Sequence, residues 1–434
     1  EFDQFPWLFS VYLLAQAVSV PIYSKLADTI GRKPVILVGV GLFLAGSILA
    51  GLAWNMTSLI TFRVVQGLGA GAAAPMTMTI VGDLYTVAER ALVQGYIASV
   101  WAVSSVVGPA LGGVFSQFAS WRWIFFVNVP LCLVAGWALV RSYHEKLERR
   151  RHRIDYAGAT LLTIGLTAVI LALLEGGNAW AWMSWQSLVS FGIGIAALAV
   201  FPLAERRAAE PVLDLSILAR PLILTTTLVS LGVGALLIGI TSFVPTYLTN
   251  SLGVVPLVSG AAVAAITLGW PVAASVAGRM YLRYGYRTTV MIGSVIALVG
   301  TVALAASGRW PNPWTVGVEL FVIGFGLGWT AAPSLIAAQA SVDWNERGVV
   351  TGLNVFARSA GSAVGVAVFG AIANNVIAAG RGEQDYATIV AASTWVFVAV
   401  AVSAALMLVA SARLPRGAVD SPAYSSAREP LLDQ

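Results

Sequence analysis

The chain has 434 residues, of which 58% are hydrophobic and only 10% are charged. Soluble domains carry charges on about a quarter of their residues, so this composition excludes a water-soluble protein. The net charge of +5 does not indicate nucleic-acid binding, because the basic residues fall in alternate short loops and not on one face. The single cysteine, Cys132, excludes a disulfide framework or a thiol–metal site within one chain.

The uncharged segments predict thirteen membrane-spanning helices, since one crossing takes about 20 predominantly apolar residues. Their glycines and prolines are tolerated in membrane helices and allow close packing. In chain order we expect the spans at 5–24, 35–53, 58–82, 91–116, 123–140, 156–174, 185–203, 221–248, 257–278, 288–307, 314–336, 348–377 and 387–412.

The distribution of lysine and arginine predicts the orientation of these spans. Three of the 25 basic residues, Arg122, Arg309 and Arg381, fall on one side, and Arg63 and Arg358 fall within spans. All the others fall on the opposite side, which the positive-inside rule identifies as cytoplasmic. With an odd number of spans, the first residue is then expected outside and the C-terminus in the cytoplasm.

The short charged segment Ser24-Lys25-Leu26-Ala27-Asp28-Thr29-Ile30-Gly31-Arg32-Lys33-Pro34 lies between the first two spans. Gly31 allows the backbone to reverse, and Pro34 suits the first turn of the following helix. The segment resembles the G-x-L-a-D-r-x-G-R-K loop of the major facilitator superfamily, with Ser24 in place of the usual glycine. The resemblance implies that Asp28, with Gly31 and Arg32, pairs with a neighbouring helix end and latches the outward-open state. A purely structural role as a charged re-entry turn is the alternative.

Arg63 lies in the middle of a long apolar segment, in the run Phe62-Arg63-Val64-Val65-Gln66-Gly67. A guanidinium near the bilayer centre costs about 2.5–3.5 kcal/mol on insertion scales, so we expect it to face a cavity or a partner. The run resembles the superfamily's R-x-x-Q-G motif, whose arginine is associated with proton transfer. A structural arginine bonded to neighbouring carbonyls is the alternative. Gln66, on the same helix face, is expected to share its network or to line the cavity.

The run Gly108-Pro109-Ala110-Leu111-Gly112-Gly113 resembles the signature that separates exporters from importers in this superfamily. Proline removes a backbone hydrogen bond and bends a helix, and the glycines allow another helix to pack against the bend. Gly108, Pro109 and Gly112 are therefore expected to take part in the conformational change, although a simple packing kink would also account for them. The following segment, from Ser120 to Pro130, resembles the start of the next helix in the same branch.

Glu319 is the one carboxylate that the pattern places clearly inside an apolar span. Such a group suits proton binding and release or pairing with a cationic substrate, whereas its position near the start of the span also allows ordinary exposure to water. Arg63 and Glu319 are our two predicted proton-coupling residues.

Arg358 and Asn354 are four residues apart and share a helix face. The run from Phe356 to Ala367 resembles the F-x-R-x-x-G-x-x-G-x-A segment of the drug:proton antiporter branch, and for Arg358 a gating role and a structural role are both open.

As residues of the substrate cavity we expect Gln66, Trp101, Asn128, Thr226, Phe243, Tyr247, Phe325, Trp329 and Asn354, although packing roles remain open for each.

The segment Gly278-Arg279-Met280-Tyr281-Leu282-Arg283-Tyr284-Gly285-Tyr286-Arg287 is a degenerate second copy of the Asp28 loop, without the aspartate. Such a repeat predicts two homologous bundles. We expect an N-terminal bundle at 1–140, a basic cytoplasmic linker with two extra helices at 141–210, a C-terminal bundle at 211–412 and a disordered tail at 413–434.

The basic segment 141–153 fits either an amphipathic helix on anionic lipids or a solvated linker. In the fourteen-helix branch one more helix, with an acidic coupling residue, precedes Phe5; we expect it to be missing here.

The resemblance implies an all-α polytopic protein of the major facilitator fold, with two six-helix bundles and two extra linker helices. It also implies multidrug efflux: a proton antiporter that exports amphipathic or cationic compounds, such as antibiotics, by alternating access. No cofactor is expected besides the proton gradient, and no metal site. The expected partners are the lipid bilayer, protons and the small-molecule substrate, with no nucleic acid, for a monomer in the cell (inner or plasma) membrane.

Two alternatives to drug export are open, a different cargo and a sensor, whereas a third, an enzyme, is not expected. The cargo could be a lipid or a secreted metabolite, or the protein could be a membrane sensor that binds a ligand without transporting it. An intramembrane enzyme would need a polar catalytic cluster at membrane depth. The two histidines, His144 and His152, both fall in a cytoplasmic loop, so an enzyme is not expected.

Overall fold

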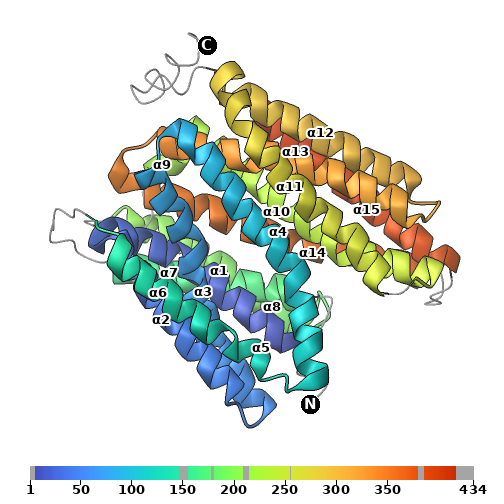
Figure 1. Ribbon diagram of the computed structural model, residues 1–434, viewed down its shortest axis with the longest axis horizontal. Helices are drawn as coiled ribbons and strands as arrows, with labels where there is room; N and C mark the ends of the chain where they lie inside the picture. The colour runs from blue at the N-terminus through green and yellow to red at the C-terminus, as the bar shows by residue number, and fades with distance from the viewer. Residues whose placement is uncertain are drawn as a thin grey trace. The chain divides into compact units, whose positions relative to one another are not determined.

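The computed structural model of the chain describes residues 5–145, 155–176, 180–208, 215–254, 256–379 and 386–416 (Figure 1). Helices dominate these residues, and ten apolar segments among them are helical and long enough to cross a membrane, α5 and α6 being counted together. The prediction of an all-α polytopic membrane protein is therefore confirmed. Residues 146–154 of the basic linker and residues 417–434 of the tail lie outside the described residues.

The chain forms two compact units, each assembled from segments that are distant in sequence. The first unit comprises Glu1–Asp83, Val107–Ala219 and Asp343–Phe356. Its helices are α1 (Phe5–Ile30), α2 (Arg32–Gly51), α3 (Met56–Leu84), α5 (Trp123–Phe126), α6 (Asn128–Ser142), α7 (Tyr156–Glu175), α8 (Trp185–Glu205) and α9 (Leu215–Ala219), with the short 3₁₀ helix η2 (Trp344–Glu346). Within it, α2 packs on α1 and α6, and α7 packs on α1 and α8.

The second unit comprises Leu84–Val106, Arg220–Val342 and Ala357–Gln434. Its helices are α10 (Pro221–Leu252), α11 (Pro256–Tyr284), α12 (Tyr286–Ser307), α13 (Pro313–Ala340) and α15 (Tyr386–Ala412). Two long helices, α4 (Val87–Phe118) and α14 (Arg347–Ala379), contribute residues to both units. In the second unit α13 packs against α11 and α12, and α15 packs against α10 and α12 (Figure 1).

The two predicted loop copies have the same backbone geometry. Gly31 has a φ of 103° and Gly285 a φ of 82°, and in both cases the preceding helix ends one residue before the glycine and the next begins one residue after it. The glycine amide donates to the carbonyl four residues earlier, Ala27 in the first copy at 3.0 Å and Tyr281 in the second at 2.9 Å. Asp28 is consequently in the last turn of α1 and not in a loop, because a single left-handed glycine is enough to reverse the chain.

The predicted span 123–140 is interrupted at Val127, which separates α5 from α6. Pro130 explains the interruption, because it has no N–H to donate to the carbonyl of Phe126, four residues earlier. A helix covers each of the other predicted spans, except that α2 ends at Gly51, two residues before the end of the span 35–53, and several helices continue beyond the predicted ends by a turn or more.

Close contact between α2 and α3 depends on glycines that face the partner helix. A Cβ atom at Gly46 would lie 2.5 Å from the amide nitrogen of Gln66 and 2.6 Å from its Cα. At Gly41, which is exposed on the same helix, a Cβ would meet nothing within 4 Å. The backbones therefore approach each other at Gly46 more closely than any larger residue allows.

We expect Gly46→Ala to destabilise the protein by about 1–3 kcal/mol, since a methyl group in a filled contact forces the backbones apart. Thermal unfolding of the purified protein in detergent measures the effect. Gly41→Ala is the matched control and should leave the unfolding temperature unchanged or raise it slightly, because alanine favours helix more than glycine does. Equal unfolding temperatures for the two variants would contradict the packing argument.

Candidate functional site

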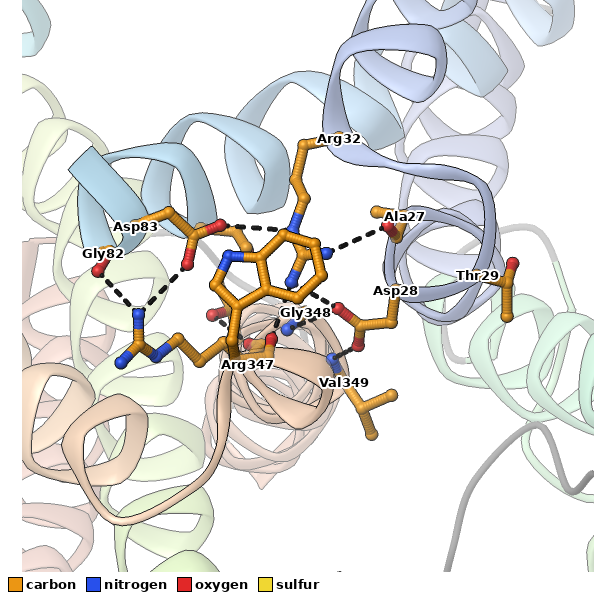
Figure 2. A network of polar contacts seen from close by, with 12 residues as sticks. Ala27, Asp28, Thr29, Arg32, Gly82, Asp83, Arg347, Gly348 and Val349 are labelled. Atoms are coloured by element: carbon orange, nitrogen blue, oxygen red, sulfur yellow. Dashed lines mark hydrogen bonds and ion pairs between the residues drawn. The ribbon is translucent and has the colours of Figure 1, made fainter. Parts of the chain in front are cut away.

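Arg32 is the centre of a buried polar network in the first unit, to which three separate segments of the chain contribute (Figure 2). Its side chain is fully buried, and one Nη nitrogen forms an ion pair with Asp28 at 2.9 Å. The guanidinium carbon lies 3.5 Å from the centre of the Trp344 ring, and the backbone carbonyls of Ala27 and Trp344 accept hydrogen bonds from the Nη groups at 3.3 and 2.7 Å. Nearly every face of the guanidinium is therefore in contact with a complementary group.

The second carboxylate of this network is Asp83, in the last turn of α3. Its Oδ2 forms an ion pair with Nε of Arg32 at 3.2 Å, and its Oδ1 accepts a hydrogen bond from Arg347 at 3.2 Å (Figure 2). Arg347 also donates to the carbonyl of Gly82 at 3.1 Å. Two arginines and two carboxylates thus balance each other's charge, which offsets the cost of removing them from water.

Asp28 holds the beginning of α14. Its two carboxylate oxygens accept hydrogen bonds from the amides of Gly348 at 3.1 Å and Val349 at 2.8 Å. The first amides of a helix have no partner within the helix and carry partial positive charge, so a carboxylate is favourable there. We call Asp28, Arg32, Asp83, Trp344, Arg347 and the amides of Gly348 and Val349 the Arg32 network.

The protonation of Asp28 is set mainly by its burial. Desolvation raises the pKa of the Asp28 carboxyl to about 7, although Arg32, the two α14 amides and Lys25 act in the opposite direction. The carboxylate in the middle of the Arg32 network therefore gains and loses its proton close to neutral pH.

The loop sequence alone indicated Asp28, Gly31 and Arg32, but it did not reveal Trp344 and Arg347. These two residues lie more than 300 positions further along the chain, in a short polar stretch just before the predicted span 348–377. That position, a tryptophan and an arginine directly before an apolar segment, was the one available signal.

Two charged side chains join the ends of α2 and α6 reciprocally. Glu145, just after α6, accepts hydrogen bonds from the first two amides of α2, those of Arg32 at 2.9 Å and Lys33 at 3.0 Å. Lys33 in turn donates to the carbonyls of Val140 and Tyr143 at the end of α6. Because Gly31 has no side chain to cap α2, a carboxylate from a distant segment supplies the cap and holds Arg32 in place.

Arg63 has partners within the first unit and is not isolated. Its Nε donates to the carbonyl of Leu8 at 3.2 Å, and Nη1 donates to Oε1 of Gln66 at 2.6 Å. The guanidinium carbon lies 4.0 Å from the centre of the Tyr12 ring. Gln66 is buried, and its Nε2 donates a hydrogen bond to the hydroxyl oxygen of Ser47 at 2.8 Å. The structure thus joins Arg63 and Gln66, as expected, while a role in proton transfer stays a prediction.

Glu319 is buried in the second unit, with 8% of its surface exposed. Its Oε2 accepts a hydrogen bond from the hydroxyl of Ser307 at 3.1 Å, and no ion pair to it is present among the described residues. Of the two alternatives left open by the sequence, burial and exposure to water, the structure shows burial. Arg63 and Glu319 belong to different units and do not form one site within either of them.

Arg358 is partly buried in α14 and, among the described residues, its side chain has no hydrogen bond, ion pair or ring contact. Asn354, one turn earlier, is buried and donates to the carbonyl of Val350 at 3.1 Å. Gly108 is exposed in α4, which is helical throughout Val87–Phe118. The surroundings of Pro109 and Gly112 lie outside the described side chains.

The residues predicted to line a substrate cavity have different environments. Tyr247 and Thr226 are fully buried, and each hydroxyl donates to a backbone carbonyl, that of Gly308 and that of Ile223 respectively. Phe243 packs against the core of the second unit. Trp329 donates to the carbonyl of Ala273 at 2.8 Å and its ring lies 5.1 Å from that of Phe325.

The two remaining cavity candidates are Trp101 and Asn128. Trp101 is 65% exposed on α4, and Asn128 is partly buried at the beginning of α6. Substrate contact by any of the predicted cavity residues stays a prediction.

The sequence pattern of the family described as Major Facilitator Superfamily matches residues 1–366. The chain belongs to the major facilitator superfamily. The proteins of this family are transporters, and the helical architecture agrees with that membership. The predicted resemblance, which began from the Asp28 loop, is confirmed.

Relatives within the superfamily are named as drug transporters and efflux pumps. The chain is 31% identical to multidrug resistance protein 3 of Bacillus subtilis (strain 168) over 87% of this chain and 73% of the relative. It is also 31% identical to multidrug transporter protein MdtP of the same organism, over 85% of this chain and 68% of the relative. Efflux pump FUS6 of Gibberella moniliformis is 30% identical over 86% of this chain and 68% of its own length.

Two solved structures share the fold. The human organic anion transporter MFSD10 aligns with a TM-score of 0.65 at 15% identity, over 94% of this chain and 83% of its own length. The proton:xylose symporter XylE aligns with a TM-score of 0.64 at 12% identity, over 97% of this chain and 88% of its own length. At such identities these structures establish the fold and nothing about the substrate.

The pKa of Asp28 leads to a pH-dependent contact between Asp28 and the beginning of α14. As the pH falls through about 7, the carboxylate gains a proton and loses its charge, so its hold on Arg32 and on the amides of Gly348 and Val349 weakens. We expect these amides to exchange hydrogen faster at pH 5.5 than at pH 8, after correction for the intrinsic exchange rate. Mass spectrometry of the peptide at 347–352 measures this, and Asp28→Asn should remove the dependence on pH. A wild-type protection that is the same at both pH values would refute it.

Loss of the cap by Glu145 should destabilise the first unit. We expect Glu145→Ala to lower the free energy of unfolding by about 1 kcal/mol, the usual effect of losing a helix cap. His144→Ala changes the exposed neighbouring residue and is the matched control. Thermal unfolding of both variants in detergent decides the point, and equal stability of the two would show that Glu145 contributes no cap.

Proposed function

We propose that this protein is a proton-coupled exporter of amphipathic or cationic small molecules, including drugs, that works by alternating access in the cell membrane. The observation that supports export most strongly is the similarity to proteins named as multidrug transporters and efflux pumps, at 30–31% identity over more than four fifths of this chain. In this proposal protons moving inward down their gradient exchange for cargo moving outward, and each elementary charge moved is worth about 2.3 kcal/mol per 100 mV.

Two groups are suited to coupling. Glu319 is a buried carboxyl whose one described partner is the neutral hydroxyl of Ser307, so its charge changes when it binds or releases a proton. Arg63 has a chain of hydrogen bonds that leads through Gln66 to Ser47. Intramembrane ionisable residues of this kind mark ion and proton pathways in transport proteins. In the proposal Glu319 carries the proton, and Arg63 responds to it through a change in its own contacts.

The Arg32 network supplies a contact that can break and form again during transport. It joins α1, α2 and α3 to the beginning of α14 through ion pairs and two helix-capping bonds. A conformational cycle that separates Gly348 from Asp28 must break several charged contacts together. In the proposal these contacts give the protein two discrete states and not a continuous range between them.

The proposal is tested by transport in proteoliposomes across an imposed pH gradient, with a fluorescent cationic dye as cargo. We expect Glu319→Gln, which keeps a hydrogen-bonding group but cannot bind and release a proton, to reduce gradient-driven export at least tenfold. It should retain exchange of labelled for unlabelled dye without a gradient. Arg63→Ala should also reduce gradient-driven export.

Glu89→Gln is the matched control for the carboxyl substitution. Glu89 is exposed at the beginning of α4 and accepts hydrogen bonds from Thr86. The Glu89→Gln variant should transport the dye like the wild type. Wild-type dye flux that is indifferent to a collapsed pH and voltage difference would refute antiport. If both Glu319→Gln and Arg63→Ala export the dye normally, the assignment of these two residues to proton coupling is wrong, while the proposal of export is unaffected.

Export of a secreted metabolite is a second candidate. It is favoured by the similarity to the transporter named for the acurin A biosynthesis cluster of Aspergillus aculeatus, at 30% identity over 85% of this chain. Competition for transport between the dye and a metabolite extract of the organism that encodes this protein, measured in the same proteoliposomes, distinguishes the two cargo classes. A metabolite cargo should displace the dye.

A further inference from the structure

Among the described residues, no carboxylate is paired with Arg358. In the described part of the second unit there are two carboxylates, Glu89 and Glu319, and they are bonded to Thr86 and Ser307 respectively. Neither is paired with Arg358, whose side chain has no hydrogen bond or ion pair among the described residues. Arg32 and Arg63 have several partners each: Arg32 has two carboxylates and two carbonyls, and Arg63 has a carbonyl, a side-chain amide and an aromatic ring.

The position of Arg358 along α14 prevents easy escape to water. It lies eleven residues after Arg347, which at a rise of 1.5 Å per residue is about 16 Å along the helix. That is roughly half of the ~30 Å hydrocarbon thickness of a bilayer. An arginine close to a helix end can extend its head group to the interface, but this side chain is too short to do so from mid-depth.

The backbone at Arg358 is held firmly against α10. A Cβ at Gly234 would collide with the carbonyl oxygen of Arg358, and one at Gly361 would collide with the carbonyl oxygen of Leu231. The hydroxyl of Ser362 donates to the carbonyls of both Gly234 and Arg358, at 3.1 and 3.0 Å. The backbone of Arg358 therefore lies in a close contact between α14 and α10.

We propose that Arg358 binds the acidic group of an amphipathic substrate. A guanidinium is charged at all physiological pH values and cannot become neutral to avoid the cost of burial. Its donors are arranged in a planar fork that matches a carboxylate, sulfonate or phosphate oxygen pair. A charged residue at membrane depth that is partly exposed and has no partner in the described part of the chain is most simply satisfied by a ligand that brings the opposite charge.

This inference rests on the proposed export function and makes it more specific. The exported amphipathic compounds would include acids, and Arg358 would distinguish an acid from its uncharged ester. The same unit contains the buried carboxyl of Glu319, so groups of both signs would be available to compounds of either charge.

The test uses a matched pair of probes, dansyl-undecanoic acid and its methyl ester, which differ in one negative charge. Binding to the full-length purified protein is followed by energy transfer from tryptophan to dansyl, with empty detergent micelles as the blank. The buffer contains no chloride and no added carboxylate, sulfonate or phosphate, because each of these anions would compete with the acid probe. The variants are Arg358→Gln and Arg358→Lys, and the control is Arg309→Gln, which removes an exposed arginine of the same unit.

We expect the wild type and Arg309→Gln to bind the acid at least tenfold more tightly than the ester, which corresponds to about 1.4 kcal/mol. Arg358→Gln should bind the two probes equally, and Arg358→Lys should keep part of the preference because it keeps the charge without the planar fork. The thermal unfolding temperature of each variant shows that it is folded.

Three results would overturn the inference: no preference for the acid in the wild type, an unchanged preference in Arg358→Gln, or a preference that millimolar chloride abolishes. The last would assign the site to an inorganic anion. Because binding is measured without a gradient, a wild type that prefers the acid through Arg358 but shows no gradient-driven flux would refute coupled export alone.

Discussion

The central constraint on this protein is that a charged group inside an apolar structure must be matched by other groups of the same chain or by a ligand. Arg32 shows the first solution completely. The fully buried guanidinium, on α2, contacts two carboxylates, two carbonyls and an aromatic ring, which α1, α3 and η2 contribute. Since removing either carboxylate would leave a buried charge uncompensated, these segments are joined by more than their apolar contacts.

The two copies of the loop show how one backbone geometry can have different chemistry. Both reverse the chain at a single left-handed glycine with the same amide-to-carbonyl bond. In the first copy Asp28 and Arg32 form an ion pair around that glycine. In the second copy the rings of Tyr281 and Tyr286 stack with their centres 4.8 Å apart. The glycine therefore determines the turn in each copy, while the side chains around it determine whether the turn carries a charged contact.

Arg32, Arg63 and Arg358 have unequal surroundings. Arg32 and Arg63 have several partners each, whereas Arg358 has none among the described residues. From residue type and position alone Arg63 and Arg358 look alike, because each is an arginine in an apolar segment with a glycine-containing motif beside it.

Much of the fold was readable from the sequence, because the length of an apolar segment and the hydrogen-bonding needs of the backbone in lipid leave helix as the main choice. The positions of the spans, the glycine reversals and the superfamily followed from that pattern and from the Asp28 loop. Tertiary structure alone decided which charges meet. Glu145 caps α2 from 113 positions away, and Trp344 and Arg347 complete the Arg32 network from a segment near the other end of the chain. Such pairings depend on distances between helices that are remote in sequence, and no local pattern encodes those distances.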